Sequence, residues 1–298
     1  MIEQFLSEVG ERDVLQHKYL LASLKMLTEE ETATLEQIFA FFEKNYGEIA
    51  KLAEAYLLIV DDFREETKYF LEHGRYRNSS YKEVAELVYF NEAYMEQYMI
   101  GLVLSDYIWS NHVQITRWFK QKLSCVQGER YFEIGPGFGH YFLMAINHTD
   151  FKEYKAVDVS QKSVEGAKKF VTTFCGDKQK QWSVECQDFL AYEDDTLYDC
   201  IVMGEVLEHV ENPEKFLEKV YRLLDEGGTC FISTVINAPA IDHIHLFSSV
   251  EEVTGMLEKA GFNVEEYLCT TENGVLLEKA LKKKRAVTII LKLKKEVR

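Results

Sequence analysis

Three histidines follow predicted strands at positions where their side chains could transfer protons. His209 comes after the apolar run "DCIVM", and His243 and His245 stand in "DHIHLF", after the run "CFISTV". Ligands of open α/β folds bind at the sheet edge formed by the carboxyl ends of the strands. Histidine titrates near neutral pH and is suited to take a proton from a hydroxyl or ammonium group. We predict His243 or His245 as the catalytic base and keep His209 as a third candidate. Helix-start packing for His209 and a loop-anchoring hydrogen bond for the other two remain open as alternatives.

Two glutamates before His209 introduce a second possibility, a site for a divalent cation. Glu205, Glu208 and His209 have i, i+3, i+4 spacing, which would place all three on one face of a helix. Together with His243 or His245 they would supply mixed nitrogen and oxygen ligands. The same string also suits ordinary helix packing, so we predict no metal in the first instance and leave metal binding open.

A glycine-rich turn lies earlier in the chain, in "FEIGPGFG". Gly135, Gly137 and Gly139 stand at alternate positions directly behind a predicted strand that contains Glu133. A strand that turns in this way into a helix brings backbone N–H groups close to a ligand, where a Cβ would block the approach. A dinucleotide fingerprint would require glycine where the chain has His140, so the spacing counts against NAD.

The next predicted strand, "YKAVDVS", ends in an acid. Asp158 lies 19 residues beyond Gly139, and a carboxylate there can accept hydrogen bonds from both hydroxyls of a ribose. The alternative is an acid that stabilises the N-terminus of the following helix. Combined with the glycine turn, the pattern favours the ribose.

The elements that must position these groups fall into two halves, residues 1–125 and 126–298. The first half has no proline and carries helix start and stop signals at Thr28 with Glu31, Ser80 with Glu83, Gly47 and Gly74. We predict four or five helices that form a separate all-α domain. The second half alternates short apolar runs with amphipathic stretches, which predicts an α/β fold with a Rossmann-like, doubly wound and mostly parallel sheet.

From about residue 131 to 294 the chain resembles the class I S-adenosylmethionine-dependent methyltransferases. The motifs that carry the resemblance occur in order: "FEIGPGFG", "AVDVS", "CQDFL", "YDCIVMGEVLEHVENPEKFLEKVYRLLDEGG", "FISTVINAP" and "HIHLFSSVEEVTGMLEKAGF". By texture the chain is similar to the small-molecule group that includes ubiquinone-biosynthesis O-methyltransferases. One departure is "LDEGG", where the family usually has a proline before the glycines.

The resemblance implies S-adenosylmethionine as cofactor and a set of contacts to it. The residues implied to line its methionine moiety are Glu133, which would orient the loop, and Gly135, Gly137 and Gly139. The residues implied to hold the adenosine are Asp158 at the ribose, Val159 and Phe189 on either side of the adenine, and Asp188 at its exocyclic amine. The residues implied to face the sulfonium are Met203 and Gly204.

The helical half matches no family that we can name, so its role is predicted from composition. The stretch "YFNEAYMEQYMIGLVLSDYIWSNHVQITRWF" is rich in Tyr, Met and Trp, which suits an apolar pocket that closes as a lid over a small organic acceptor. The candidate pocket residues are Tyr94, Tyr98, Trp109 and His112. Helix-on-helix packing is the alternative for all four.

Composition narrows the range of partners. A net charge of −16 would repel a polyphosphate, which argues against nucleic acid. No apolar run approaches the roughly 20 residues that a bilayer crossing needs, and the acidic N-terminal segment is unlike a secretory signal, so we predict a cytoplasmic protein. The alternatives to small-molecule methylation are a metal-assisted version of it, methylation of a protein side chain, aminopropyl transfer and a non-catalytic cofactor-binding module. The sequence does not indicate the oligomeric state.

Overall fold

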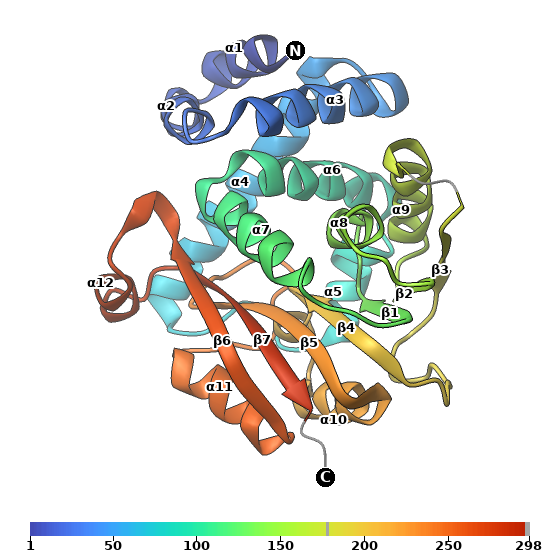
Figure 1. The fold of residues 1–298 in the computed structure, drawn as a ribbon. Helices are drawn as coiled ribbons and strands as arrows, with labels where there is room; N and C mark the ends of the chain where they lie inside the picture. The colour runs from blue at the N-terminus through green and yellow to red at the C-terminus, as the bar shows by residue number, and fades with distance from the viewer. Residues whose placement is uncertain (177–178, 296–298) are drawn as a thin grey trace.

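The computed structural model describes residues 1–176 and 179–295, and its first half is helical (Figure 1). This half contains α1 (Ile2–Arg12), α2 (Val14–Leu24), α3 (Glu29–Tyr46), α4 (Ile49–His73), α5 (Tyr81–Val84), the π-helical turn η1 (Ala85–Tyr89), α6 (Glu92–Ile108) and α7 (Ser110–Leu123). The predicted signals are confirmed. Thr28 and Glu31 form a capping box, the Ser80 side chain accepts from the Glu83 N–H, and Gly47 and Gly74 follow α3 and α4.

The predicted number of helices was too low, because two chain breaks use neither glycine nor proline. Asp13 adopts an extended conformation between α1 and α2, and its carboxylate accepts from the N–H groups of Leu15 and Gln16. Trp109 is also extended, with φ −86° and ψ 127°, and separates α6 from α7. An isolated extended residue of this kind leaves no mark in the apolar periodicity.

The second half forms a seven-stranded sheet, as the strand and helix alternation predicted. Its strands are β1 (Arg130–Ile134), β2 (Glu153–Asp158), β3 (Gln181–Cys186), β4 (Tyr198–Gly204), β5 (Leu224–Ile236), β6 (Phe262–Thr271) and β7 (Val287–Lys295). The order is β3-β2-β1-β4-β5-β7-β6, and β7 runs antiparallel to both its neighbours. The edge strand β6 was not predicted because its sequence, "FNVEEYLCTT", is interrupted by the adjacent Glu265 and Glu266 and contains only a short apolar run.

Two hydrophobic clusters lie on opposite faces of this sheet. On one face pack α7, α8 (His140–His148) and α9 (Gln161–Phe174), and on the other α10 (Pro213–Leu223) and α11 (Val250–Lys259). Alternate residues of a strand point to opposite faces, so Tyr131 of β1 joins the first cluster and Phe132 the second. Beyond η3 (Glu272–Gly274), the short helix α12 (Leu277–Lys282) precedes β7.

The helical half shares its core with one face of the sheet. Buried side chains from α1 to α7 belong to the same cluster as those of α8 and α9. The ring of Phe138, in the glycine loop, lies 6.3 Å from Phe41 and 5.3 Å from Phe42 of α3, and 5.7 Å from Phe170 of α9, measured between centroids. The loop that follows β1 is therefore supported from the helical side.

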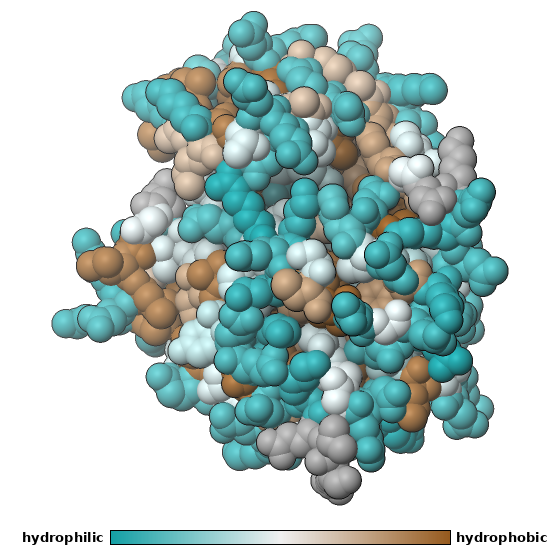
Figure 2. Space-filling model, viewed as in Figure 1, coloured by the Kyte–Doolittle hydropathy of each residue, from teal (hydrophilic) through white to brown (hydrophobic). Residues whose placement is uncertain are grey.

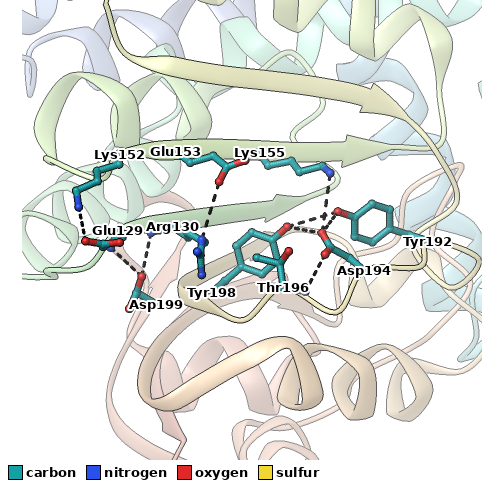
Figure 3. Close-up of polar contacts among 10 residues, drawn as sticks. All are labelled: Glu129, Arg130, Lys152, Glu153, Lys155, Tyr192, Asp194, Thr196, Tyr198 and Asp199. Carbon is teal, nitrogen blue, oxygen red and sulfur yellow. Dashed lines mark hydrogen bonds and ion pairs between the residues drawn. The ribbon is translucent and has the colours of Figure 1, made fainter.

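A network of ion pairs and hydrogen bonds links β1, β2 and the segment before β4 (Figure 3). The Asp199 carboxylate accepts from the N–H groups of Glu129 and Arg130, at 2.8 and 2.9 Å. The Asp194 carboxylate accepts from the hydroxyls of Tyr192 and Tyr198. These contacts hold the strands at positions remote from the glycine loop.

The molecular surface on the face shown in Figure 2 is mostly hydrophilic, with apolar side chains gathered near α12 and near α1 and α2. Leu276, just before α12, is 77% exposed. Within the described residues, no helix has the length and apolarity needed to cross a membrane.

Candidate active site

Two adjoining cavities open at the carboxyl edge of the sheet, where β1 and β4 lie side by side and the strand order reverses. Ligands of open α/β sheets bind at this switch point. The larger cavity has a volume of about 600 Å³ and the smaller one about 480 Å³. The residues that line both are Tyr98, Met99, Leu102, Gly135, Gly137, Glu205 and His209.

The glycine loop forms the floor between the two cavities. Gly135 has φ 65°, and a Cβ added to it would lie 2.7 Å from the Val206 side chain. Gly137, with φ 55°, is also left-handed. The loop thus needs glycine both for its backbone conformation and for its approach to the β4 loop. Gly139 is the N-cap residue of α8 and lines neither cavity.

Asp158 lies at the end of β2, 9% exposed, in the wall of the smaller cavity. Its carboxylate accepts from the N–H of Gly137 at 3.1 Å and from that of Ser160 at 2.8 Å. Burial raises the pKa of Asp158 to about 6, against the opposing effect of these two hydrogen bonds. The same carboxylate therefore fixes the glycine loop and faces the cavity.

The other residues predicted for the adenosine line the same smaller cavity. Val159 is 40% exposed, which leaves its side chain available to a ligand. Phe189 is buried, with ring centroids 6.2 Å from Phe132 and 5.4 Å from Phe216. Asp188 accepts from the Leu190 N–H at 2.8 Å. A cavity lined by apolar side chains together with two acids, Asp158 and Asp188, suits an adenosine, so these residues fit the predicted cofactor.

The residues predicted for the methionine end of the cofactor do not all line a cavity. Glu133 and Gly204 line the larger cavity, whereas Met203 is fully buried in the cluster on the opposite face of the sheet and lines neither cavity. The Glu133 carboxylate accepts from the Tyr131 hydroxyl. Burial raises the pKa of Glu133 to about 8, opposed by the hydrogen bonds from Tyr131 and the Phe142 N–H.

His209 is held by an aspartate that the sequence did not single out. Its Nδ1 lies 3.1 Å from the backbone oxygen of Asp242 and 3.4 Å from the Asp242 carboxylate. Asp242 is 2% exposed, and it accepts from the hydroxyls of Tyr98, at 2.8 Å, and Tyr89, at 3.4 Å. A proton on Nδ1 satisfies these oxygens and leaves Nε2 as an acceptor.

The other two histidine candidates occupy different surroundings. His243 lines the larger cavity and donates from Nδ1 to the Ala238 carbonyl at 2.6 Å, so its Nε2 is also an acceptor. Burial lowers the pKa of His243 to about 4. His245 lies outside both cavities, and its ring packs 4.5 Å from that of Phe247. The structure thus brings His209 and His243 together and leaves His245 apart.

The predicted helical face of Glu205, Glu208 and His209 is wrong. Residues Leu207–His209 form a single 3-10 turn, and Glu205 precedes it with φ 52°. The Glu205 N–H donates to the backbone oxygen and hydroxyl of Ser233, at 3.0 and 3.2 Å, which ties it to β5 and prevents a regular helix.

Glu208, His209 and His243 nevertheless converge. One ligand atom from each of these side chains lies within 4.8 Å of the others. Glu208 is fully buried, and its Oε2 accepts from the Thr234 hydroxyl at 2.8 Å. Its side chain also interacts with that of Glu205, and its Oε1 has no other hydrogen-bond partner among the described residues. Burial and the nearby Glu205 raise the pKa of Glu208 well above its usual range.

The four residues predicted for the acceptor lie on α6 or at the start of α7. Tyr98, Trp109 and His112 line the larger cavity. Tyr94 lines neither; it donates its hydroxyl to Asp62 and stacks on Tyr98, with centroids 5.6 Å apart. Burial lowers the pKa of His112 to about 4.

Several residues of the cavity walls were missed by the sequence analysis: Tyr89, Asp106, Asn111, His140 and Asp242. Asp242 stands next to His243 in "DHIH", which was a usable signal. Its bond to Tyr98 spans 144 positions, and no local pattern indicates such a contact.

Comparison with known proteins identifies the family. The sequence profile of a methyltransferase domain matches residues 111–267, just over half of the chain. The chain belongs to this methyltransferase family. As expected from the motifs, it is a class I S-adenosylmethionine-dependent methyltransferase.

The curated relatives of this methyltransferase include ubiquinone biosynthesis O-methyltransferases. The enzyme of Glaesserella parasuis is 36% identical over 92 residues, which cover 30% of this chain and 39% of that protein. The mitochondrial enzyme of Dictyostelium discoideum is 25% identical over 126 residues, 42% of this chain and 34% of that protein. The chain therefore spans about a third of the length of these relatives.

Solved structures similar to this methyltransferase share its fold. A methyltransferase-annotated protein of Bacillus halodurans is 15% identical, with a TM-score of 0.51 over 62% of this chain and all of that one. The cyclopropane synthase MmaA2 of Mycobacterium tuberculosis is 13% identical, with a TM-score of 0.50 over 62% of this chain and 84% of that one.

Proposed function

We propose that the methyltransferase transfers the methyl group of S-adenosylmethionine to an oxygen or nitrogen of a small organic acceptor in the larger cavity. The observation that carries this proposal is the His209–Asp242 pair: His209 lines both cavities, and Asp242 lines the smaller one. A volume of about 600 Å³ is in the range of small-molecule sites. The names of the curated relatives, which are O-methyltransferases, favour oxygen.

Some residues of the chain would hold the cofactor, and others would take the proton from the acceptor. The bound cofactor supplies an activated methyl group on a sulfonium. Asp158, Asp188 and the glycine loop would hold its adenosyl part, which leaves alignment of the acceptor to the walls of the larger cavity. As the acceptor oxygen gains the methyl group, its proton would pass to His209 Nε2.

Asp242 would act on this proton transfer through His209. A carboxylate beside Nδ1 fixes the histidine tautomer and stabilises the imidazolium that forms. Tyr98 and Tyr89 in turn fix the Asp242 carboxylate by their hydroxyls. His209 thus has a carboxylate beside its Nδ1, whereas the Nδ1 of His243 meets a neutral carbonyl.

Substitution of the pair tests this proposal. We expect His209→Ala to lower kcat with a catechol acceptor about 10²- to 10³-fold, with little change in affinity for S-adenosylhomocysteine by calorimetry. Asp242→Asn should lower kcat less and shift the pH profile of kcat. A His209→Ala enzyme that keeps the wild-type kcat would contradict the proposed base.

A metal-assisted O-methyltransferase is the second candidate, favoured by the convergence of Glu208, His209 and His243. Two imidazoles and a carboxylate are a suitable ligand set for a divalent ion. Glu208 Oε1 accepts from no N–H or hydroxyl of the described residues outside the carboxyl pair with Glu205. A metal there would lower the pKa of an acceptor hydroxyl. The test is activity after chelation and dialysis: this candidate predicts loss, with recovery on addition of magnesium or zinc, and full activity without metal would exclude it.

The remaining alternatives are weaker. Family membership sets aside aminopropyl transfer and the non-catalytic module. Methylation of a protein side chain would require a peptide to reach a cavity walled by α4, α6 and α7. A cytoplasmic location stays a prediction from composition, and some relatives carry the word mitochondrial in their names.

A further inference from the structure

The loop that follows β3 forms a tight turn at the smaller cavity. The backbone oxygen of Asp188 accepts from the N–H groups of Ala191 and Tyr192, at 3.1 and 2.9 Å. The Asp188 carboxylate accepts from the Leu190 N–H at 2.8 Å, and the Phe189 oxygen has a longer bond, 3.3 Å, from the Tyr192 N–H. The turn thus directs its N–H groups mainly at Asp188, and the later carbonyls need donors from elsewhere, as at the end of a helix.

A buried lysine of α10 supplies these donors. Lys219 is 9% exposed, and its Nζ donates to the backbone oxygens of Phe189 at 2.6 Å, of Leu190 at 3.1 Å and of Tyr192. An ammonium group has three N–H donors, so each carbonyl receives one. These three carbonyls are its hydrogen-bond partners in the described part of the chain, and no carboxylate is among them. Because a buried charge is costly unless it is hydrogen-bonded, the ammonium and the loop hold one another in place.

The loop that Lys219 holds is part of the wall of the smaller cavity. Asp188, Phe189 and Leu190 all line that cavity, whereas Lys219 lines neither. The Lys219 Nζ also lies 5.0 Å from the centroid of the Phe189 ring, close enough for a cation–π attraction. One side chain therefore restrains both the backbone of the loop and the ring that faces the predicted adenine.

We propose that Lys219 is a positioning residue for the nucleoside of the cofactor. Its ammonium fixes the loop 188–192, and the loop places Asp188 and Phe189 against the ligand. Without the ammonium these carbonyls lose their donor, and the loop would have to move to bring them to water. The inference rests on the assignment of the adenosine to the smaller cavity.

Calorimetry on Lys219→Met tests the proposal. Methionine keeps an unbranched apolar stem but donates no hydrogen bond. We expect the variant to bind S-adenosylhomocysteine and 5′-methylthioadenosine at least about tenfold more weakly. The factor should be the same for both ligands, because the second lacks the amino-acid end and the loop faces the nucleoside. With a catechol acceptor, the KM for S-adenosylmethionine should rise by this factor, while kcat at saturating cofactor should keep its wild-type value.

Lys180 offers a matched control. Its side chain is 17% exposed, and its Nζ donates to the backbone oxygens of Ile146, at 2.7 Å, and of Thr149. It lines neither cavity. Lys180→Met therefore removes the same kind of contact elsewhere: it should lower the melting temperature but leave both affinities and the KM unchanged. If the two lysine variants bind the nucleosides alike, Lys219 has only a structural role.

The failure of the proposal can be told from the failure of the adenosine assignment. Wild-type affinities in Lys219→Met, with weakened binding in Asp158→Ala, would overturn the role of Lys219 alone. Wild-type affinities in both variants would remove the adenosine from the smaller cavity, and the proposal with it. If Lys219→Met does not fold, Lys219→Gln keeps two N–H donors on a shorter side chain and should weaken both nucleosides about threefold. An unchanged affinity in that variant would likewise contradict the proposal.

Discussion

Two groups of acids in this methyltransferase differ in what surrounds them. Asp194, in the network of Figure 3, opposes the cost of burial with hydrogen bonds from Thr196, Tyr192 and Tyr198, which hold the pKa of Asp194 well below its usual range. At the cavities burial has a larger effect on the acids than hydrogen bonds do. It raises the pKa of Glu133, Asp158 and Glu208.

These opposite pKa shifts separate acids that stabilise the fold from acids that are stabilised only when a ligand binds. A carboxylate with several donors within the chain lowers the free energy of the folded state by itself. A buried carboxylate with too few donors raises that free energy until a ligand supplies what is missing, and such groups cluster at functional sites. Substitutions in the two groups should therefore separate binding from stability.

The largest effect should come from Asp158→Ala, on binding. Loss of two charge-assisted hydrogen bonds to a ribose, at about 1.5 kcal/mol each, should weaken S-adenosylhomocysteine about 100-fold by calorimetry. The Gly137 and Ser160 N–H groups lose their acceptor, but the removal of a carboxylate that burial disfavours offsets part of this cost. The melting temperature should therefore fall only slightly. An unchanged affinity would remove Asp158 from the cofactor site.

Asp194→Asn should have the opposite profile. We expect a loss of about 2 kcal/mol in the free energy of unfolding at pH 7, because two tyrosine hydroxyls lose a charged acceptor, and no change in affinity for S-adenosylhomocysteine. Since the folded-state pKa is depressed, the stability due to Asp194 is present above its unfolded value near 3.9 and is lost as the pH falls below it. The difference between wild type and variant in urea unfolding should thus shrink below about pH 4.

Glu133→Gln should show the smallest effect, with the reverse dependence on pH. Because the folded-state pKa of Glu133 is raised to about 8, the stability due to its protonated form is fully present below the unfolded value. It is lost as the pH rises from that value to about 8, and above pH 8 the loss is complete. The variant lacks this loss. The difference in melting temperature, variant minus wild type, should be roughly 3 °C larger at pH 9 than at pH 6. A constant difference across this range would show that Glu133 does not titrate as the structure indicates.

Much of the fold could be predicted from the sequence because its signals are local. Apolar runs, caps and the glycine turn each depend on a few neighbouring residues, and they gave the parallel sheet and the ends of α3 and α4. The break at Trp109 and the polar edge strand β6 lack such signals, and the N-cap signal of Asp13 was missed.

The site was less predictable because its contacts are distant in the sequence. Glu208, His209 and His243 could be grouped from the chain order of the strands, although the α-helix expected at Glu205 does not form. Asp242 and Asp106 acquire their surroundings only when α6 packs over the sheet edge. The position of Asp242 beside His243 was a local signal, but no nearby residue indicated its contact with Tyr98.

The rings of Phe41 and Phe42 that support Phe138 have a practical consequence for engineering. Because the glycine loop packs on α3, replacing the helical half to change the acceptor would also change how the loop holds the nucleoside. A chimera that replaces residues 1–125 would have to retain both phenylalanines, or supply rings of equal size, before any new specificity could be measured.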